Sequence, residues 1–314
     1  MRRVVGTLVL TLLVVSVACN PLPPCRKGRR CPKPPATTTT TMAPRRAQAD
    51  RTAVFNGLGA WVDVYDWSPS FSPSARWGLD DVDRIAAAGV QVLYLQSAKA
   101  MRPEDILDPD KFKSIVDRAH AKGMRVVSWY LPANLDPKSD VIKLVAPLKF
   151  GVDGIAMDIE STDQKDLAVR NNSLVLQSLF VRLFLPDVAM AAIVLPPVVT
   201  DVLNRNYWPN FPWTKIKGAY DVWMPMGYWT NRTTASGWRD GEKYTNENID
   251  RVRANLGDPA APVHPVGGIG DKATIEEIDG FVRSAQSRGA IGGSMYDDRT
   301  SNPDQYTALQ PLRR

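Results

Sequence analysis

From residue 53 onward, short apolar runs alternate with segments in which apolar residues recur at helical spacing. Strands that are apolar along their whole length are buried on both faces, which is typical of parallel sheets. Eight such strand and helix units follow one another, and this number predicts a closed (β/α)8 barrel, the TIM barrel fold. The predicted strands are 59–67, 90–96, 125–131, 152–160, 188–196, 220–229, 261–269 and 290–298.

An open, doubly wound sheet is the alternative arrangement of alternating strands and helices. Such a sheet usually carries a glycine-rich turn directly after its first strand, where a dinucleotide binds. The sequence GLGAW at 57–61 is similar to such a turn, but it begins before the first predicted strand instead of following it. The closed barrel is therefore favoured.

The N-terminal sequence MRRVVGTLVLTLLVVSVAC predicts export. Two arginines precede an apolar run from Val4 to Ala18, which is shorter than the roughly 20 residues that span a bilayer. This order is typical of a signal peptide, to which we assign residues 1–18. Two outcomes stay open: Cys19 carries a lipid that anchors the protein to a membrane, or the protein is secreted without lipid. Both predict an extracellular or cell-envelope location.

Residues 19–51 are rich in proline, threonine and basic side chains. Such a segment buries too little apolar surface to fold, so we predict a disordered Pro/Thr-rich basic linker before one barrel domain over residues 52–314. The formal charge is +6 for the whole chain, whereas residues 52–314 sum to −3. A groove that follows phosphates is therefore not expected, and nucleic acid is not a predicted partner. We expect a monomer.

Polar and aromatic side chains gather at the carboxyl ends of the predicted strands, where TIM barrel enzymes hold their active sites. Carboxylates serve acid–base chemistry, and aromatic rings suit the apolar faces of sugars. The combination predicts a site for an oligosaccharide or polysaccharide. Apart from three catalytic candidates introduced below, the predicted substrate-binding residues are Asp63, Tyr65, Asp66, Trp67, Gln96, Tyr130, Met226, Trp229, Tyr296 and Asp297.

The fourth predicted strand ends in two carboxylates, within the sequence GVDGIAMDIES at 151–161. Strand side chains alternate between faces, so Ala156, Asp158 and Glu160 share one face and rise toward the rim of the barrel. Two carboxylates this close repel each other when both are ionised, so one proton should be retained near neutral pH. Glu160, nearest the rim, is the candidate proton donor. The alternative is a structural pair satisfied by neighbouring donors.

Two motifs resemble the family 18 glycoside hydrolases, the chitinase-like barrels. DGIAMDIE at 153–160 is similar to the D-G-x-D-x-D-x-E signature of their fourth strand, and MPMGYW at 224–229 is similar to their Met-x-Tyr motif. The resemblance implies that Glu160 protonates the glycosidic oxygen. It also implies that Asp158 orients the substrate's N-acetyl group, with Tyr228 as a supporting donor.

One position departs from the family pattern. Ala156 stands where the signature has its middle aspartate. Sugars without an N-acetyl group are therefore also considered as substrates, with Asp63, Asp66 or Asp297 as the second carboxylate. A barrel that binds carbohydrate without cleaving it is the main alternative function.

Further alternatives rest on other features. A phosphate-binding barrel is suggested by Gly267, Gly268 and Gly270 and by Gly292 and Gly293 in the last strand, although glycines in strands more often mark close packing. A plain envelope scaffold is the other alternative. No metal or other cofactor is predicted, since the only two histidines, His120 and His264, are expected to be structural.

Overall fold

The computed structural model describes residues 47–314, so the predictions for the signal peptide, Cys19 and linker residues 19–46 lie outside the described residues. Eight parallel strands form one sheet in the order β6-β5-β4-β3-β2-β1-β8-β7. Parallel bridges from Trp223 to Val263 and from Met226 to Val266 join the two edges of this sheet. The ring is thereby nearly closed, and the predicted (β/α)8 barrel is confirmed.

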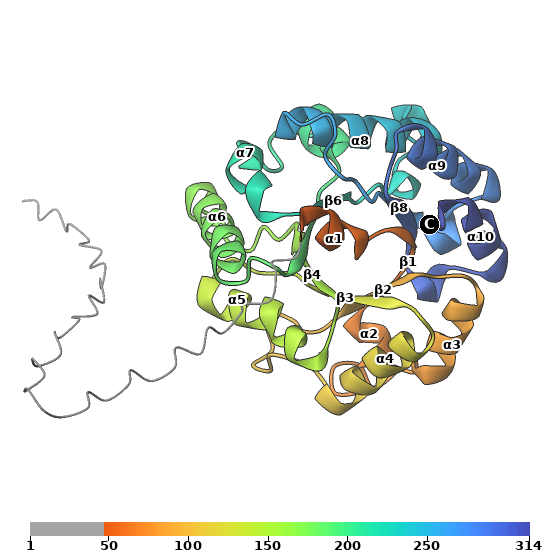
Figure 1. Ribbon diagram of the computed structural model, residues 1–314. Coiled ribbons are helices and arrows are strands. Elements are labelled where there is room, and N and C mark those ends of the chain that lie inside the picture. Colours follow the sequence, from red (N-terminus) through yellow and green to blue (C-terminus); the bar gives the residue numbers. More distant parts are fainter. Residues whose placement is uncertain (1–46) are drawn as a thin grey trace, which may run out of the picture. The chain divides into compact units, whose positions relative to one another are not determined.

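The strands line a central ring and the helices surround it (Figure 1). The strands are β1 Gly57–Val62, β2 Val92–Gln96, β3 Arg125–Tyr130, β4 Gly154–Ile159, β5 Ala189–Val194, β6 Val222–Pro225, β7 Val266–Ile269 and β8 Gly292–Tyr296. The helices are α1 Gln48–Ala53, α2 Val64–Trp67, α3 Leu79–Ala87, α4 Pro109–Ala121, α5 Pro137–Val145, α6 Leu167–Phe184, α7 Trp213–Ile216, α8 Gly241–Leu256, α9 Ile275–Ser287 and α10 Pro303–Ala308.

The alternation of strand side chains produces two apolar cores. Side chains on the inner face fill the barrel, among them Trp61, Tyr94, Ala156 and Ile193. Side chains on the outer face pack against the helices in a larger cluster. Burial on both faces explains why the strands read as nearly continuous apolar runs.

Polar residues fix where several helices begin. Asp136 accepts hydrogen bonds from the first backbone N–H groups of α5, and Asp166 does the same for α6. Thr274 and Glu277 form a capping box at the start of α9. These side chains satisfy amide groups that have no partner within the helix.

The connection from β5 to β6 differs from the other units. In place of a long helix it contains a π-helical turn at Val198–Leu203 and the short helix α7. Prolines at 196, 197, 209 and 212 interrupt this segment, and each removes a backbone donor that a helix needs. No helix within residues 47–314 combines the length and the apolar character that crossing a membrane requires.

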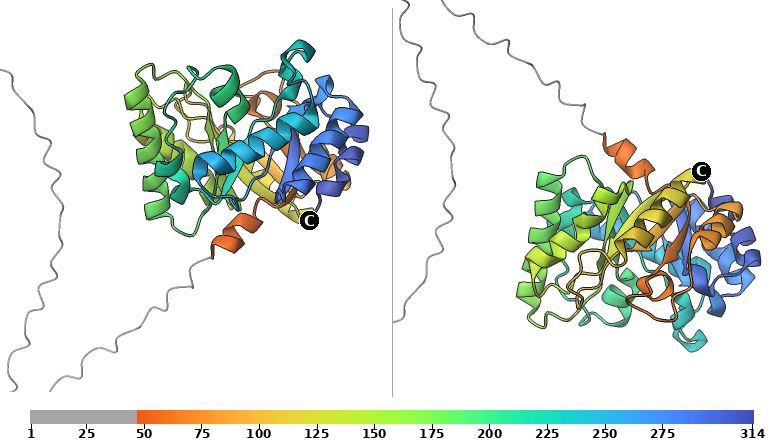
Figure 2. Two further views of the ribbon diagram at one scale, coloured as in Figure 1. Left: turned by 90° about the horizontal axis from the view of Figure 1, so that it is seen from above. Right: turned by 90° about the horizontal axis from the view of Figure 1, so that it is seen from below.

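Helix α1 begins inside the segment predicted as linker. It lies at the amino-terminal end of the barrel (Figure 2), where Arg125 at the start of β3 donates a hydrogen bond to the Ala53 carbonyl oxygen. The Arg51 guanidinium also pairs with Asp221 at 2.9 Å. These contacts order residues 48–51, so the folded unit starts before residue 52, and the predicted linker 19–51 is too long at its C-terminal end.

Close packing accounts for the glycines of β7 and β8. A Cβ atom on Gly292 would overlap the backbone of Gly57, and one on Gly267 would lie 2.5 Å from the Met295 sulfur atom. Protein atoms therefore fill the space beside these glycines. The structure favours the packing interpretation over a phosphate site.

Candidate active site

The two carboxylates of β4 line one cavity at the carboxyl end of the barrel. The cavity has a volume of about 230 Å³, and both Asp158 and Glu160 contribute to its wall. Asp158 is the penultimate residue of β4 and is 6% exposed, whereas Glu160 directly follows the strand and is half-buried. The predicted placement of the pair on one face is therefore confirmed.

Six other predicted residues reach the same cavity. They come from the ends of four further strands and from α2, which shows that the carboxyl ends of distant segments meet here. These residues are Asp63, Tyr65, Gln96, Met226, Tyr228 and Tyr296.

Burial changes the acid–base behaviour of the pair. Loss of solvation raises the pKa of Asp158 well above its ordinary value, and the neighbouring Glu160 charge raises it further. Burial likewise raises the pKa of Glu160. The Lys99 ammonium acts in the opposite direction on both groups. Both carboxyl groups therefore stay protonated to a higher pH than an exposed carboxyl group does.

Three side chains of the cavity have a buried polar atom without a hydrogen-bond partner among residues 47–314. These atoms are Oδ1 of Asp158, Nε2 of Gln96 and Nε1 of Trp129. Unpaired buried polar groups are costly and rare in folded proteins. Two donors and one acceptor are thus available to a polar ligand with both kinds of group.

Aromatic rings form much of the wall. The ring centroids of Tyr228 and Tyr296 lie 5.6 Å apart, and those of Trp61 and Trp129 lie 5.9 Å apart. The Tyr296 hydroxyl also donates to Asp63 at 3.4 Å. The wall therefore combines flat apolar surfaces with fixed polar groups, which is the usual composition of a small-molecule site.

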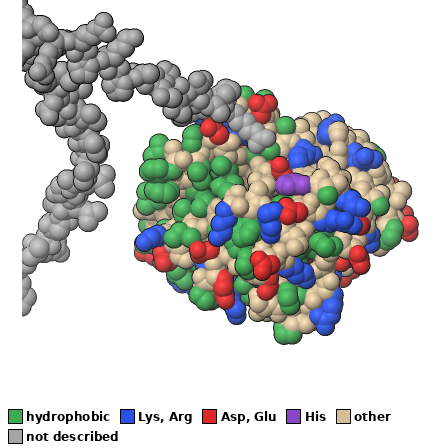
Figure 3. Space-filling model, turned by 60° about the horizontal axis from the view of Figure 1, so that its bottom comes forward, with side chains coloured by type: hydrophobic (Ala, Val, Ile, Leu, Met, Phe, Trp, Pro, Cys, Tyr) green, Lys and Arg blue, Asp and Glu red, His purple; other side chains and the backbone are tan. Residues whose placement is uncertain are grey.

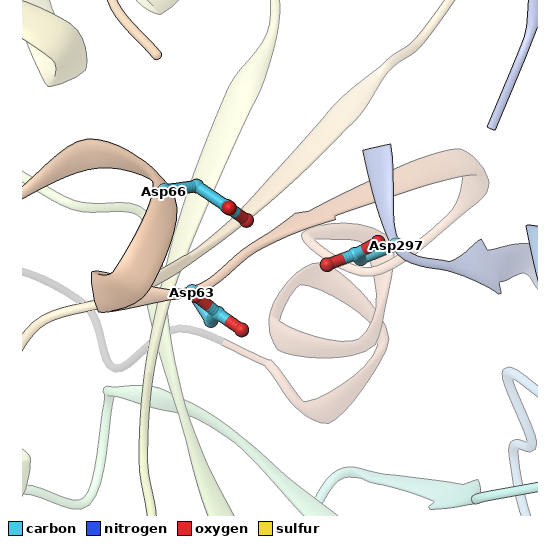
Figure 4. Close-up of side chains that lie close together, drawn as sticks. All are labelled: Asp63, Asp66 and Asp297. Carbon is cyan, nitrogen blue, oxygen red and sulfur yellow. The ribbon is translucent and has the colours of Figure 1, made fainter. Parts of the chain in front are cut away.

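A second carboxylate group lies at the rim. Asp63 follows β1, Asp66 belongs to α2 and Asp297 follows β8, and Figure 4 shows their side chains converging. One oxygen atom of each lies within 4.8 Å of the others, a spacing that a hard divalent cation could use. Arg299 already supplies a positive charge, since its guanidinium pairs with Asp66 at 3.1 Å.

Asp66 should make stability depend on pH. Burial, then the charges of Asp63 and Asp297, raise its pKa from 3.8 to about 6. The ionised form is disfavoured in the folded state, so this group removes stability as the pH rises from about 4 through about 6. We therefore compare the melting temperatures of Asp66→Asn and the wild type. The melting temperature of the variant minus that of the wild type should be larger at pH 7 than at pH 4. Thermal unfolding at both pH values measures this, and an equal difference at both would contradict it.

No protein-family model matches the sequence, and the search of curated proteins found no match. Solved structures do match. The spore cortex-lytic enzyme SleL of Bacillus cereus has a TM-score of 0.59 and 10% identity, covering 82% of this chain and 75% of SleL. A family 18 chitinase of Cycas revoluta, solved with (GlcNAc)3, has a TM-score of 0.59 and 10% identity, covering 81% and 98%. A chitinase of Chromobacterium violaceum has a TM-score of 0.56 and 12% identity, covering 82% and 99%.

The fold is therefore similar to that of the chitinase barrels. The resemblance to family 18 that the two motifs indicated is thus found again in the backbone. At sequence identities of 10–12% these matches establish the fold alone. The chemistry of the site follows from the residues that line the cavity.

Besides Asp66 and Asp297 at the rim, three predicted substrate-binding residues do not line the cavity. Trp67 is fully buried against Phe112, with its indole N–H bonded to the Gln96 carbonyl oxygen. Trp229 is fully buried against Phe281. Tyr130 points outward, where its hydroxyl donates to Asp140 at 2.7 Å. For these residues the sequence prediction is wrong.

Strand ends and register explain these errors. The first strand ends at Val62, because Asp63 accepts a hydrogen bond from the Tyr65 N–H group and starts α2. The helix then turns Trp67 away from the cavity. In β3, Trp129 pairs with Ala156 of β4 and therefore shares its inward face, which leaves Tyr130 on the outer face.

Six lining residues were not among the predicted substrate-binding candidates: Trp61, Lys99, Trp129, Leu131, Ile193 and Val266. Trp129 would have been predicted instead of Tyr130 if the sequence had shown which side chains of β3 face inward. Lys99 lies in the loop after β2, and its ammonium lies 4.8 Å from the ring centroid of Tyr65. No strand pattern reaches this loop, so the sequence held no signal for Lys99.

Proposed function

We propose that this protein is an exported glycoside hydrolase that cleaves a polysaccharide or cell-wall glycan with Glu160 as general acid. One observation carries the proposal: Asp158 and Glu160 lie on one face of β4, in the wall of one cavity, and both have a raised pKa. The chitinase-like fold and the aromatic wall support the same substrate class.

Glu160 is suited to donate the proton. It lies nearer the rim than Asp158 and is more exposed, so a glycosidic oxygen can approach it. Its raised pKa keeps the carboxyl protonated nearer to neutral pH, and protonation turns the sugar oxygen into a good leaving group. Water or a second group then attacks the sugar carbon from the other side.

In this proposal, Asp158 and Tyr228 have the role of holding the sugar during this step. Both line the cavity, and Asp158 Oδ1 is available as an acceptor. In one route Asp158 orients an N-acetyl group that acts as internal nucleophile, as the family resemblance implies. In the other route Asp63 at the rim, or its neighbours Asp66 and Asp297, provides the second carboxylate for a sugar without that group.

A carbohydrate-binding barrel without turnover is the second candidate, and Ala156 favours it. The residue is fully buried on the inner face beside Trp129 and Ala191, in the place of the signature's middle aspartate. Incubation with a panel of cell-wall glycans and chitin oligosaccharides separates the two functions. New reducing ends support the hydrolase, whereas binding without any new reducing end supports the binding barrel.

The Lys99 charge should set the alkaline limit of activity. Activity falls as the pH rises through the pKa of Glu160, because the proton to be donated is lost. Lys99 lowers that pKa, so Lys99→Met should move the alkaline limb to higher pH. The pH profile of kcat/KM measures the shift, and Lys165→Met, at an exposed site outside the cavity, serves as the control. An unchanged limb would contradict this assignment.

Export is proposed from the N-terminal sequence. A basic start, an apolar run and Cys19 support either lipid anchoring or release. Mass spectrometry of the mature protein distinguishes them: an N-terminal Cys19 with added lipid mass indicates an anchor, and an unmodified new N-terminus indicates secretion. A protein that still begins at Met1 would contradict both.

A further inference from the structure

The outer side of α6 is unusually apolar. Seven exposed side chains form what we term the α5–α6 face, with Leu176, Leu183 and Phe184 exposed by 66%, 73% and 63%. Figure 3 shows hydrophobic side chains gathered on one side of the molecule. The face consists of Ile142, Val169, Leu176, Leu179, Phe180, Leu183 and Phe184.

These side chains follow the spacing of a helix that pairs with another helix. Val169, Leu176 and Leu183 recur every seven residues, and Leu179 lies three residues after Leu176. Apolar residues at alternating steps of three and four form the seam of a coiled coil. In α6 this seam lies on the exposed side, because the opposite side already packs on the barrel through Leu174 and Val181.

A groove lies beside the seam. It has a volume of about 600 Å³ between α5 and α6, and side chains of the face form most of its wall. The face thus has both projecting side chains, such as Leu183, and a hollow between Ile142 and Leu176 that could receive them. A two-fold axis brings such complementary features together twice.

Charge favours a protein partner over an anionic lipid surface. Helix α6 contains no acidic residue and two arginines. The Arg170 guanidinium lies over the Trp208 ring, and Arg182 pairs with Asp221, so both are used within the barrel. Lys138 is the only cation in the groove wall described by the structure. Interfacial helices usually carry many exposed cations.

The exposed area matches the need of a stable dimer. A fully exposed side chain of this size presents about 200 Å² of surface. The exposed fractions of the seven side chains then add up to roughly 750 Å². The largest apolar patch on a typical monomer is about 300–600 Å². A standard protein interface buries about 800 Å² on each partner.

We infer that the α5–α6 face binds the same face of a second copy of this chain. Two α6 helices pack along their seams, and each copy places leucine and phenylalanine side chains against the groove of the other. This contact is separate from the cavity at the carboxyl end of the barrel and does not depend on the proposed hydrolase activity. It replaces the monomer expected from the sequence.

Sedimentation velocity of the full chain under reducing conditions tests the inference. The wild type should shift from monomer to dimer as its concentration is raised about a hundredfold. The double variant Leu176→Glu with Leu183→Glu should dimerise at least about a hundredfold more weakly, because four charges would have to be buried. Circular dichroism verifies that the variant is folded.

Matched variants make the outcome specific. Met101→Glu adds a charge at an equally exposed apolar residue outside the face and should leave dimerisation unchanged. Leu176→Met with Leu183→Met should also preserve it. A wild type that stays monomeric would overturn the inference, as would a dimer that persists in the double glutamate variant. Vesicles of phosphatidylglycerol bound by a monomeric wild type, but not by that variant, would assign the face to lipid and also overturn it.

Discussion

Replacing Glu160 with glutamine is expected to lower turnover about a thousandfold, the usual contribution of a general acid. The amide has nearly the volume of the carboxyl group but cannot donate an acidic proton to a glycosidic oxygen. Glu160 forms no ion pair within residues 47–314 and is half-buried, so the free energy of unfolding should change by less than about 1 kcal/mol. Initial rates of reducing-end release and urea denaturation measure the two effects.

Asp163→Asn is the matched control for this variant. Asp163 lies in the same loop after β4 but is exposed and does not line the cavity. Its replacement makes the same change from carboxyl to amide in the same loop and should leave turnover within about twofold of the wild type. If Glu160→Gln kept full activity on a glycan that the wild type cleaves, Glu160 would have no part in the proton transfer.

The barrel was predictable because burial on both faces dictates long apolar runs. The same reasoning located Asp158 and Glu160, since a period of two places alternate side chains on one face. It also located Tyr228, which follows β6, and Tyr296, the last residue of β8, because the apolar runs marked the ends of these strands within a few residues. These predictions required only the direction of the strands and the known position of active sites in such barrels.

The errors have a common physical origin. Whether Trp67 faces the cavity depends on one hydrogen bond of Asp63, which ends the strand and begins α2. Whether Trp129 or Tyr130 faces inward depends on the register between β3 and β4. Both are tertiary or capping effects that an apolar run does not encode. Lys99 and the cluster around Asp66 depend on loop conformation, which periodicity does not describe.

Replacing Asp221 with alanine is expected to lower the free energy of unfolding by about 3–5 kcal/mol, the cost of breaking a buried ion pair. The Asp221 side chain is 2% exposed and accepts hydrogen bonds from Arg51, Arg182 and the Met190 N–H group, at 2.9, 2.7 and 3.0 Å. It thus connects α1, α6 and the start of β5. Without it, two guanidinium groups lose their shared carboxylate in a mostly buried place. Urea denaturation of both proteins at neutral pH measures the difference.

The expected loss of stability in Asp221→Ala is large because the Asp221 carboxylate is buried. An exposed ion pair serves as the comparison. Glu104 pairs with Arg102 at 3.2 Å, but both side chains are substantially exposed. Water replaces such a partner at little cost, so Glu104→Ala should change the free energy of unfolding by less than about 1 kcal/mol. Equal losses in the two variants would mean that Asp221 does not act as a buried counter-charge. A much larger loss in Asp221→Ala would show that this buried carboxylate strengthens the attachment of α1 and α6, in addition to the apolar contacts of α6 and the hydrogen bond from Arg125 to Ala53.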